Sequence, residues 1–338
     1  MIKIAVDAMG GDKGLDSTVK ASMDAVKAFD DIEINLYGDK EKIESLLTDK
    51  TRINVIPTTA VLDMGEKDPV KAVRHLRNDA SLCVALSDAK KGLSDVVITS
   101  GPTQCVVVAS HLLVRRLPQV ERIALCPIIP NFDGHPRLLL DVGANIELRS
   151  EHINTLATLA TICAKEVLGY ENPRVGLLNI GSEPGKGREV DKEAYDLLKE
   201  NKNINFYGNI EGNEVLNAPT EIIITDGFTG NVCMKTIEGA GKVFAKMLKQ
   251  EIKSSLGGKI GYLFMRKNLK RFAKRMDSKE IGGAMILGVG VPVIKAHGNS
   301  DAYAFFNAIK QGREMVNKHF IEKITSALNK EDDSNGSN

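Results

Sequence analysis

The stretch Ile222-Ile223-Ile224-Thr225-Asp226-Gly227-Phe228-Thr229-Gly230-Asn231 contains the pattern that decides the fold of this chain. Its three β-branched apolar residues fit a strand buried on both faces, as in a parallel sheet. Two glycines then allow a sharp turn and a close approach of backbone to ligand. Beyond them, apolar residues recur on one helical face, at Val232, Ile237, Ala240, Val243, Phe244, Met247 and Leu248. The stretch predicts a strand, a polar loop and a helix whose positive end faces an anion such as phosphate.

The composition is that of a soluble globular protein. The chain has 338 residues, with 43% hydrophobic and 26% charged residues and a net charge of +1. The balanced charge and the absence of Trp argue against a nucleic-acid-binding surface. The five cysteines show no CxxC spacing, so we expect buried thiols in a reducing cytosol. We find no signal peptide and no apolar run long enough to span a bilayer, and we expect a cytoplasmic protein.

Short apolar strands alternate with helical periods along the chain. We expect strands at 2–6, 32–38, 53–57, 96–98, 123–129, 138–142, 175–180, 205–207, 222–224 and 291–295. We expect helices at 16–29, 68–91 with a break near 78–79, 102–116, 151–168, 192–199, from 232 to about 276, and 300–328. This alternation predicts an α/β fold with a mostly parallel sheet. We expect one catalytic domain over 1–330, which can comprise two subdomains around a cleft, and a disordered tail over 331–338.

Glycine and small polar or charged residues follow several of the predicted strands. These strand ends are 7–12, 99–101, 141–145, 179–181, 226–231 and 295–298. Ligands of open α/β sheets bind outside the carboxyl ends of the strands, so we expect these ends to form one site along one edge. The alternative is that each glycine only serves its turn.

Cofactor and metal motifs are missing. The chain has no GxGxxG after its first strand, no GxxxxGK[ST], no HExxH and no GxSxG. We therefore expect no cofactor and no metal. Asp7, Asp141 and Asp226 can hold Mg²⁺ or orient loop amides, and we favour the second interpretation.

Basic side chains lie in two of these loops. Lys186 lies in a flexible loop after a buried strand, and Lys295 and His297 close another strand. Such groups bind phosphate and stabilise negative charge that develops on a carbonyl oxygen. Asn231 and Asn145 are further candidate donors to that oxyanion.

Several blocks resemble the signature blocks of the bacterial phosphate acyltransferase (PlsX) family. They appear in the family's order and extend from Met1 to about Val316. The blocks are Asp7-Ala8-Met9-Gly10-Gly11-Asp12, Leu140-Asp141-Val142-Gly143-Ala144-Asn145, Gly176 to Gly181 with Lys186-Gly187, Gly208 to Gly212, Thr225 to Val232 with Lys235-Thr236 and Glu238-Gly239, and Ile294 to Gly298 with Ser300-Asp301.

The resemblance implies a reaction in which long-chain acyl-[acyl carrier protein] and inorganic phosphate give acyl phosphate for phospholipid synthesis. It implies a Rossmann-like α/β/α fold akin to phosphotransacetylases and isocitrate-dehydrogenase-like enzymes, and a homodimer. It also implies a downstream partner, the glycerol-3-phosphate acyltransferase PlsY.

The site residues follow from these blocks and from the polar strand ends. We assign catalytic roles to Lys186, Asn231, Lys295 and His297. We assign phosphate or substrate binding to Asp7, Gly10, Gly11, Asp12, Gly101, Asp141, Asn145, Asn179, Asp226, Thr229 and Gly230. The chain departs from the family at Thr99-Ser100-Gly101-Pro102-Thr103-Gln104, where Ser-Ala-Gly-Asn-Thr-Gly is usual, and also at Gly14-Leu15 and Asn213-Glu214.

A basic amphipathic segment over about 250–277 predicts a protruding helical hairpin with its tip at Gly257-Gly258. We expect it to contact the inner face of the membrane or the acidic acyl carrier protein; packing against a partner subunit is the alternative. The contact residues we assign are Lys259, Leu263, Phe264, Arg266, Lys267, Lys270 and Arg271.

Two other functions stay open at this point. An impaired relative that mainly binds the membrane and lipid-synthesis partners is compatible with the altered loop at 99–104. An isocitrate-dehydrogenase-like oxidoreductase requires nucleotide and metal sites, for which the sequence has no motif.

Overall fold

The strand β10 (Ile222–Ile224) lies in the interior of its sheet, between the parallel strands β7 and β8. The computed structural model describes residues 1–275, 278–280 and 282–335. Ile222 and Ile224 belong to one hydrophobic core cluster and Ile223 to another. The strand is therefore buried on both faces, which confirms the prediction. Burying one such side chain stabilises a fold by about 1.5–3 kcal/mol.

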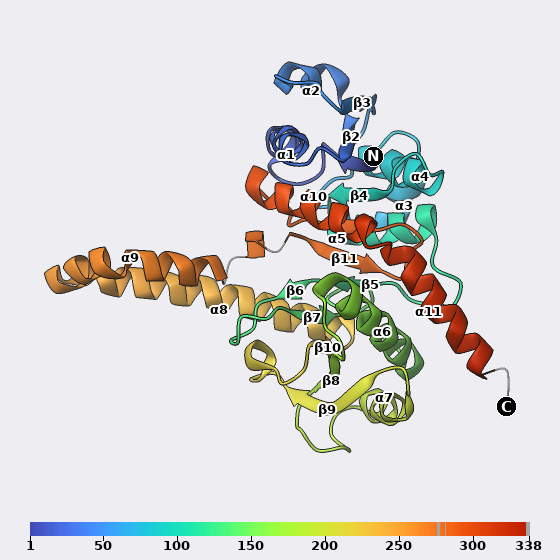
Figure 1. The fold of residues 1–338 in the computed structure, drawn as a ribbon, viewed down its shortest axis with the longest axis vertical. Coiled ribbons are helices and arrows are strands. Elements are labelled where there is room, and N and C mark those ends of the chain that lie inside the picture. Colours follow the sequence, from blue (N-terminus) through green and yellow to red (C-terminus); the bar gives the residue numbers. More distant parts are fainter. Residues whose placement is uncertain (276–277, 281, 336–338) are drawn as a thin grey trace.

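A seven-stranded sheet occupies the half of the molecule that contains the N-terminus (Figure 1). Its order is β3-β2-β1-β4-β12-β11-β5. The strands are β1 (Ile2–Asp7), β2 (Ile32–Gly38), β3 (Ile53–Pro57), β4 (Val96–Thr99), β5 (Ala124–Cys126), β11 (Ala284–Leu287) and β12 (Val293–Lys295). All neighbours are parallel except β11, which is antiparallel to both β12 and β5.

A five-stranded sheet forms the other half, in the order β6-β7-β10-β8-β9. Its remaining strands are β6 (Ile128–Ile129), β7 (Arg137–Leu140), β8 (Arg174–Asn179) and β9 (Asn205–Glu211), and only the β6–β7 pair is antiparallel. The two sheets meet where β5 contacts β7. Here the Val142 N–H donates to the Leu125 carbonyl over 3.0 Å.

Helices cover the faces of both sheets (Figure 1). The α-helices of the chain are α1 (Gly14–Ala28), α2 (Lys40–Leu46), α3 (Pro69–His75), α4 (Ser81–Lys90), α5 (Thr103–Ala109), α6 (Ser150–Cys163), α7 (Glu189–Glu200), α8 (Gly227–Ser254), α9 (Leu256–Arg275), α10 (Ala302–Asn317) and α11 (Phe320–Asn335), of which α8 and α9 protrude from the body. α10 packs on α1 in one half, and α11 packs on α6 in the other. The α/β class and the mostly parallel sheets agree with the sequence prediction.

Four differences from the predicted elements have local causes. The helix α2, which we did not predict, begins where the Asp39 carboxylate accepts the Lys42 N–H. The predicted strand 123–129 is two strands in different sheets, because Pro127 separates β5 from β6. The sequence analysis does not predict the strand β11. The predicted helix 300–328 is two helices, since His319 has a left-handed φ of 53°.

The helical hairpin is longer than the basic segment over about 250–277 that predicted it. It consists of α8 and α9, which protrude together from the body (Figure 1). The chain turns at Ser255, so the predicted tip at Gly257-Gly258 is wrong: both glycines lie in the first turn of α9. Residues 276–277, at the end of the predicted segment, lie outside the described residues. At the C-terminus, α11 continues to Asn335 within the predicted tail, and 336–338 are not described.

The start of α8 packs so closely on the loop after β7 that only glycine fits. A Cβ at Gly230 would overlap the carbonyl oxygen of Asp141, and one at Gly227 would overlap that of Asn145. We predict that Gly230→Ala lowers the free energy of unfolding by about 1–3 kcal/mol, because rigid backbone must move to admit the methyl group. Urea unfolding measures this loss.

Gly212→Ala is the matched control, since nothing lies within 4 Å of a Cβ at Gly212. Its free energy of unfolding should stay within about 0.5 kcal/mol of the wild-type value. Equal stabilities for the two variants would contradict the close packing of α8.

Candidate active site

The predicted strand ends divide between the two sheets. Adjacent strands β1, β4 and β12 end together at one edge of the larger sheet, and β7, β10 and β8 end together at one edge of the smaller sheet. We call these the β1–β4–β12 edge and the β7–β10–β8 edge. The expectation of a single sheet edge is therefore wrong, because the middle of the chain, from β6 to β10, builds its own sheet. α8 connects the two edges, as described below.

Asp7 holds the β1–β4–β12 edge together. Its buried carboxylate accepts the Ser81 hydroxyl (2.5 Å), the Thr99 hydroxyl (2.7 Å) and the Gly10 N–H (3.2 Å). Burial raises the pKa of Asp7, and these hydrogen bonds counteract part of that rise. Asp7 therefore orients the loop, as the amide interpretation predicts.

The glycines of this edge allow its loops to meet. A Cβ at Gly10 would overlap the Asp7 carboxylate, and Gly101 lies against the same carboxylate. Gly11 has a φ of +87° and lies beside the Ser100 side chain. The Asp12 N–H donates to the carbonyl of Gly298 over 2.7 Å, which ties the loop after β1 to the loop after β12.

Lys295 is a half-buried cation at the end of β12. No carboxylate oxygen lies within 4.0 Å of its ammonium among the residues that the structure describes. Burial lowers the pKa of Lys295, while Asp12 and Glu238 attract the ammonium and oppose that shift. Glu238 belongs to α8, so this helix reaches from the β7–β10–β8 edge to Lys295. Nearby, His297 is exposed at the surface of the same edge.

Asp141 organises the β7–β10–β8 edge and joins it to the larger sheet. Its fully buried carboxylate accepts the N–H groups of Gly143 (3.1 Å), Ala144 (3.0 Å) and Asn145 (2.7 Å), and also that of Leu125 in β5 (3.0 Å). Burial raises the pKa of Asp141, and these donors oppose the rise.

Asn145 supports the backbone in this arrangement. Its side-chain amide donates to the Ile123 carbonyl (2.7 Å) and to the Asp141 carboxylate (2.9 Å). Both amide hydrogens are therefore already used, since an Asn side chain has two. The hypothesis that Asn145 donates to an oxyanion does not agree with this geometry.

The N-terminus of α8 opens at the same edge. Asp226 caps the helix by accepting the Thr229 N–H (2.7 Å), and its other oxygen pairs with Arg188 (2.5 Å). Arg188 also pairs with Asp191 (2.8 Å), and these two carboxylates raise the pKa of its guanidinium. Asn231 donates one amide hydrogen to the Val142 carbonyl (2.8 Å).

The loop that carries Lys186 is held by asparagines. Asn179 donates to the Lys186 carbonyl (3.0 Å), and Asn209 donates to the Glu183 carbonyl (2.8 Å). Asn179 therefore shapes this loop. The side chain of Lys186 is 51% exposed, with the Glu183 carboxylate 4.0 Å from its ammonium, so it is free to turn toward a ligand.

The structure separates supporting residues from groups that can meet a ligand. Asp7, Asp141, Asn145, Asn179 and Asp226 hold loops, whereas Lys186, Thr229, Asn231, Lys295 and His297 keep polar atoms available at the two edges. Sequence reasoning missed Arg188 and Glu238 as site residues. Glu238 stood in a quoted block, but no local pattern shows that it approaches Lys295. Within the described ranges, no group of three or more His, Cys, Asp and Glu residues is arranged to hold a metal ion.

Solved structures share the fold of this chain. A phosphotransacetylase from Streptococcus pyogenes covers 93% of this chain and 93% of its own, with a TM-score of 0.61 and 14% identity. A branched-chain phosphotransacylase from Enterococcus faecalis covers 94% of this chain and 99% of its own, with a TM-score of 0.58 and 14% identity. The chain thus has a Rossmann-like, phosphotransacetylase-type fold.

Sequence relatives give the family. The family model described as "Fatty acid synthesis protein" matches residues 2–323. The phosphate acyltransferase of Acholeplasma laidlawii is 44% identical over 334 residues, 98% of this chain and 100% of the relative. That of Bacillus licheniformis is 42% identical over 325 residues, 95% of this chain and 98% of the relative. The chain belongs to the phosphate acyltransferase family, as the signature blocks predicted.

The half-buried Lys295 leads to a prediction of how the free energy of unfolding depends on pH. Its folded-state pKa lies below the ordinary value of 10.5, so between the two values the unfolded chain binds more protons. The free energy of unfolding then rises with pH in that window, because the cost of burying the cation disappears. We predict that Lys295→Met, which keeps the length of the side chain, is at least as stable as wild type at neutral pH. It should also lack this alkaline gain.

Urea unfolding of both proteins between about pH 7 and pH 10 tests this prediction. The difference between the two proteins isolates Lys295 from the other titrating groups. A variant that is much less stable at neutral pH would show instead that the ammonium has a stabilising partner.

Proposed function

We propose that this enzyme transfers the acyl group of long-chain acyl-[acyl carrier protein] to inorganic phosphate. A phosphate oxygen attacks the thioester carbonyl, and the carbon–sulfur bond breaks. The products are acyl phosphate and free carrier protein, and the proton of hydrogen phosphate ends on the carrier's sulfur. The observation that carries the proposal is the N-terminus of α8, capped by Asp226, with the half-buried Thr229 and Asn231 in its first turns and the exposed Lys186 on a neighbouring loop.

The phosphate would bind against Thr229, Gly230 and Asn231. A helix N-terminus favours an anion by about 0.3–1 kcal/mol even before charged side chains contribute. Lys186 would supply a mobile positive charge. Arg188 is paired with Asp191 and Asp226, so the charge of its guanidinium is already balanced within the protein.

The thioester would approach from the β1–β4–β12 edge. Glu238, which attracts Lys295, lies two helical turns beyond Asn231, about 10 Å along the axis of α8. Lys295 and His297 therefore suit the carbonyl oxygen and the leaving group better than the phosphate bound at the helix N-terminus. We therefore place Lys186, and not Lys295, at the phosphate.

The reaction can be tested by trapping acyl phosphate as its hydroxamate. We expect palmitoyl-[acyl carrier protein] to give hydroxamate only when phosphate is present. Lys186→Ala and Asn231→Ala should each reduce the rate by about 10²–10³, because each removes a group that stabilises developing negative charge.

Lys192→Ala is the matched control, since Lys192 is an exposed lysine on α7 that pairs with Glu189. Its rate should equal that of wild type. Wild-type turnover in either single variant would remove that residue from the proposed site. Folded wild-type protein that forms no hydroxamate would refute the reaction itself and favour an impaired binding protein.

The hairpin has apolar surface that this chain leaves uncovered. On α8 the predicted apolar face is solvent-exposed: Val243 is 55%, Phe244 68% and Met247 57% exposed. On α9, Leu263 is 70% and Phe264 84% exposed. Single exposed apolar residues are ordinary, but a continuous face of them marks an interaction surface. We propose that the α8 face packs against a second copy in a homodimer.

The basic and apolar residues of α9 suit peripheral contact with an anionic membrane on the cytoplasmic side. Lys259, Arg266, Lys267, Lys270 and Arg271 pair with no carboxylate among the described residues. Each such cation contributes about 1 kcal/mol near an anionic surface. No helix among the described residues is long and apolar enough to cross a bilayer. Membrane contact would place acyl phosphate near its proposed consumer, the glycerol-3-phosphate acyltransferase PlsY.

Charge reversal on α9 tests the membrane proposal. We expect the combined change Lys267→Glu, Lys270→Glu and Arg271→Glu to reduce sedimentation with phosphatidylglycerol vesicles at least about tenfold. The same reversals at Lys20, Lys27 and Lys90, which are exposed on α1 and α4, should leave sedimentation unchanged. Equal vesicle binding by both variants would count against a membrane role for α9.

A further inference from the structure

The side chain of Arg188 pairs with the acid at the start of α8. Its guanidinium lies 2.5 Å from the Asp226 carboxylate and 2.8 Å from the Asp191 carboxylate. Asp191 belongs to the first turn of α7, whose positive end also offsets its charge. Asp226 is only 3% exposed, so Arg188 supplies the cation that this buried carboxylate requires.

The loop that carries Lys186 does not depend on the guanidinium of Arg188. Asn179 donates to the Lys186 carbonyl over 3.0 Å, and Asn209 donates to another carbonyl of the loop over 2.8 Å. The backbone N–H of Arg188 donates to Asp191 over 2.7 Å, a bond that does not need an arginine. The guanidinium can therefore be removed while these hydrogen bonds hold the loop.

The acid that caps α8 lies where the phosphate is proposed to bind. One oxygen of Asp226 accepts the Thr229 N–H over 2.7 Å, and the other pairs with Arg188. A carboxylate is a favourable cap because a helix N-terminus is positive, yet its charge repels a second anion at that terminus. Among the described residues, Arg188 is the one cation with a nitrogen within 4.0 Å of this carboxylate. The cap and a bound anion are therefore compatible when this cation is present.

We propose that Arg188 is a positioning residue that lets the capped N-terminus of α8 accept phosphate. It acts through Asp226, because it holds the carboxylate in the cap and offsets the charge that would otherwise repel the anion. The inference rests on the proposed function, which places phosphate at this terminus. Arg188 contacts no reacting atom in that scheme, because its guanidinium is occupied by two carboxylates of the protein.

Three variants at this ion pair test the role of charge. Arg188→Met leaves the Asp226 carboxylate unpaired and should raise the Kd for inorganic phosphate about tenfold, by charge repulsion across a few ångström. Asp226→Asn keeps a side-chain oxygen for the Thr229 N–H but removes the charge, and it should lower that Kd at least about threefold. The double variant should return to within about twofold of wild type. Phosphorus NMR titration of each protein with inorganic phosphate measures these Kd values.

Steady-state kinetics in the hydroxamate assay give a second readout. For Arg188→Met we expect the KM for phosphate to rise with the Kd, about tenfold. The kcat at saturating phosphate and the KM for palmitoyl-[acyl carrier protein] should stay within about twofold of wild type, because Arg188 touches neither the thioester nor the attacking oxygen. General damage to the fold would instead lower kcat and weaken phosphate binding in all three variants.

Arg174→Met is the matched control for a lost ion pair. Arg174 begins β8 and pairs over 3.0 Å with Glu221, which directly precedes β10. The arginine is 43% exposed and the acid 13%, so the pair resembles that of Arg188 and Asp226, but it lies at the opposite, amino ends of the same strands. At that distance the lost charge is screened, and the phosphate Kd should stay within about twofold of wild type.

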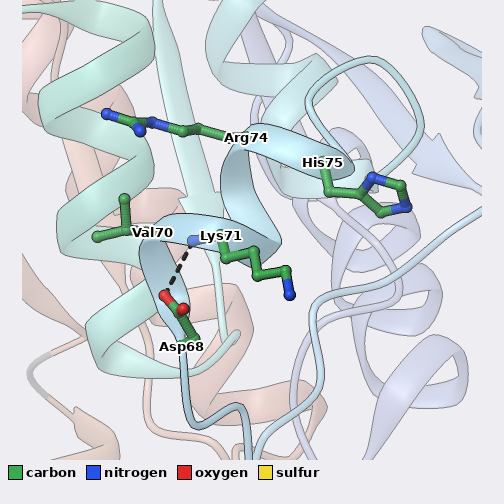
Figure 2. A pocket seen from close by; sticks show the side chains of 5 residues that line it. All are labelled: Asp68, Val70, Lys71, Arg74 and His75. Carbon is green, nitrogen blue, oxygen red and sulfur yellow. Dashed lines mark hydrogen bonds between the residues drawn. The ribbon is translucent and has the colours of Figure 1, made fainter.

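Arg74→Met is the control for the loss of an exposed guanidinium. Figure 2 shows Arg74 extending from α3, where it lines a hollow of ≈ 470 Å³ with Asp68, Val70, Lys71 and His75. α3 packs on α5, which follows β4 of the larger sheet. The phosphate Kd of this variant should also stay within about twofold of wild type, since a solvated charge outside the ion pair is screened.

A phosphate Kd that is the same for Arg188→Met and wild type would overturn the proposal. An Asp226→Asn variant that binds phosphate more weakly than wild type would also overturn it, and this comparison decides by itself if Arg188→Met does not fold. Wild-type protein that binds phosphate, with the expected pattern among the variants, but forms no hydroxamate would refute the proposed reaction and leave the role of Arg188 intact.

Discussion

The hydrogen bonds that the Asp141 carboxylate accepts are the interaction on which the rest of the structure depends. The carboxylate lies fully buried at the end of β7, accepts the N–H groups of the following loop, and accepts the Leu125 N–H from β5 in the other sheet. A buried carboxylate without such donors would cost several kcal/mol, so the loop and β5 must assemble around it together. The Asp141 carboxylate thus stabilises both the junction of the two sheets and the loop of the candidate site.

The helix α8 rests on this junction. Gly227 and Gly230 let its first turn lie directly against the carbonyls of Asn145 and Asp141. The helix therefore starts in a place and direction set by backbone contact. From there it passes Lys295, which Glu238 attracts, and then leaves the body as the hairpin (Figure 1). One continuous helix thus links the proposed anion site, the second sheet edge and the proposed dimer and membrane surfaces.

The buried acids and the lysines of the candidate site have different roles. The buried acids Asp7, Asp141 and Asp226 all receive hydrogen bonds from backbone N–H groups, so their charges are used within the protein. Lys186 and Lys295 have no close acidic partner of this kind among the described residues, apart from Glu183 at 4.0 Å from Lys186. Lys186 lies near the N-terminus of α8 and Lys295 further along that helix, and cations so placed would attract the proposed anionic substrates.

The sequence by itself determined the strand, loop and helix around Ile222–Asn231, the α/β class, most strand positions and the loops that hold polar groups. These features depend on the period of apolar residues and on glycine, which are local properties of the chain. Only the tertiary structure decided which strand ends share an edge, that Asn145 and Asn179 serve the backbone, and that Arg188 and Glu238 join the site. The reason is physical: a hydrogen bond or an ion pair joins residues far apart in the chain, and local periodicity carries no information about such partners.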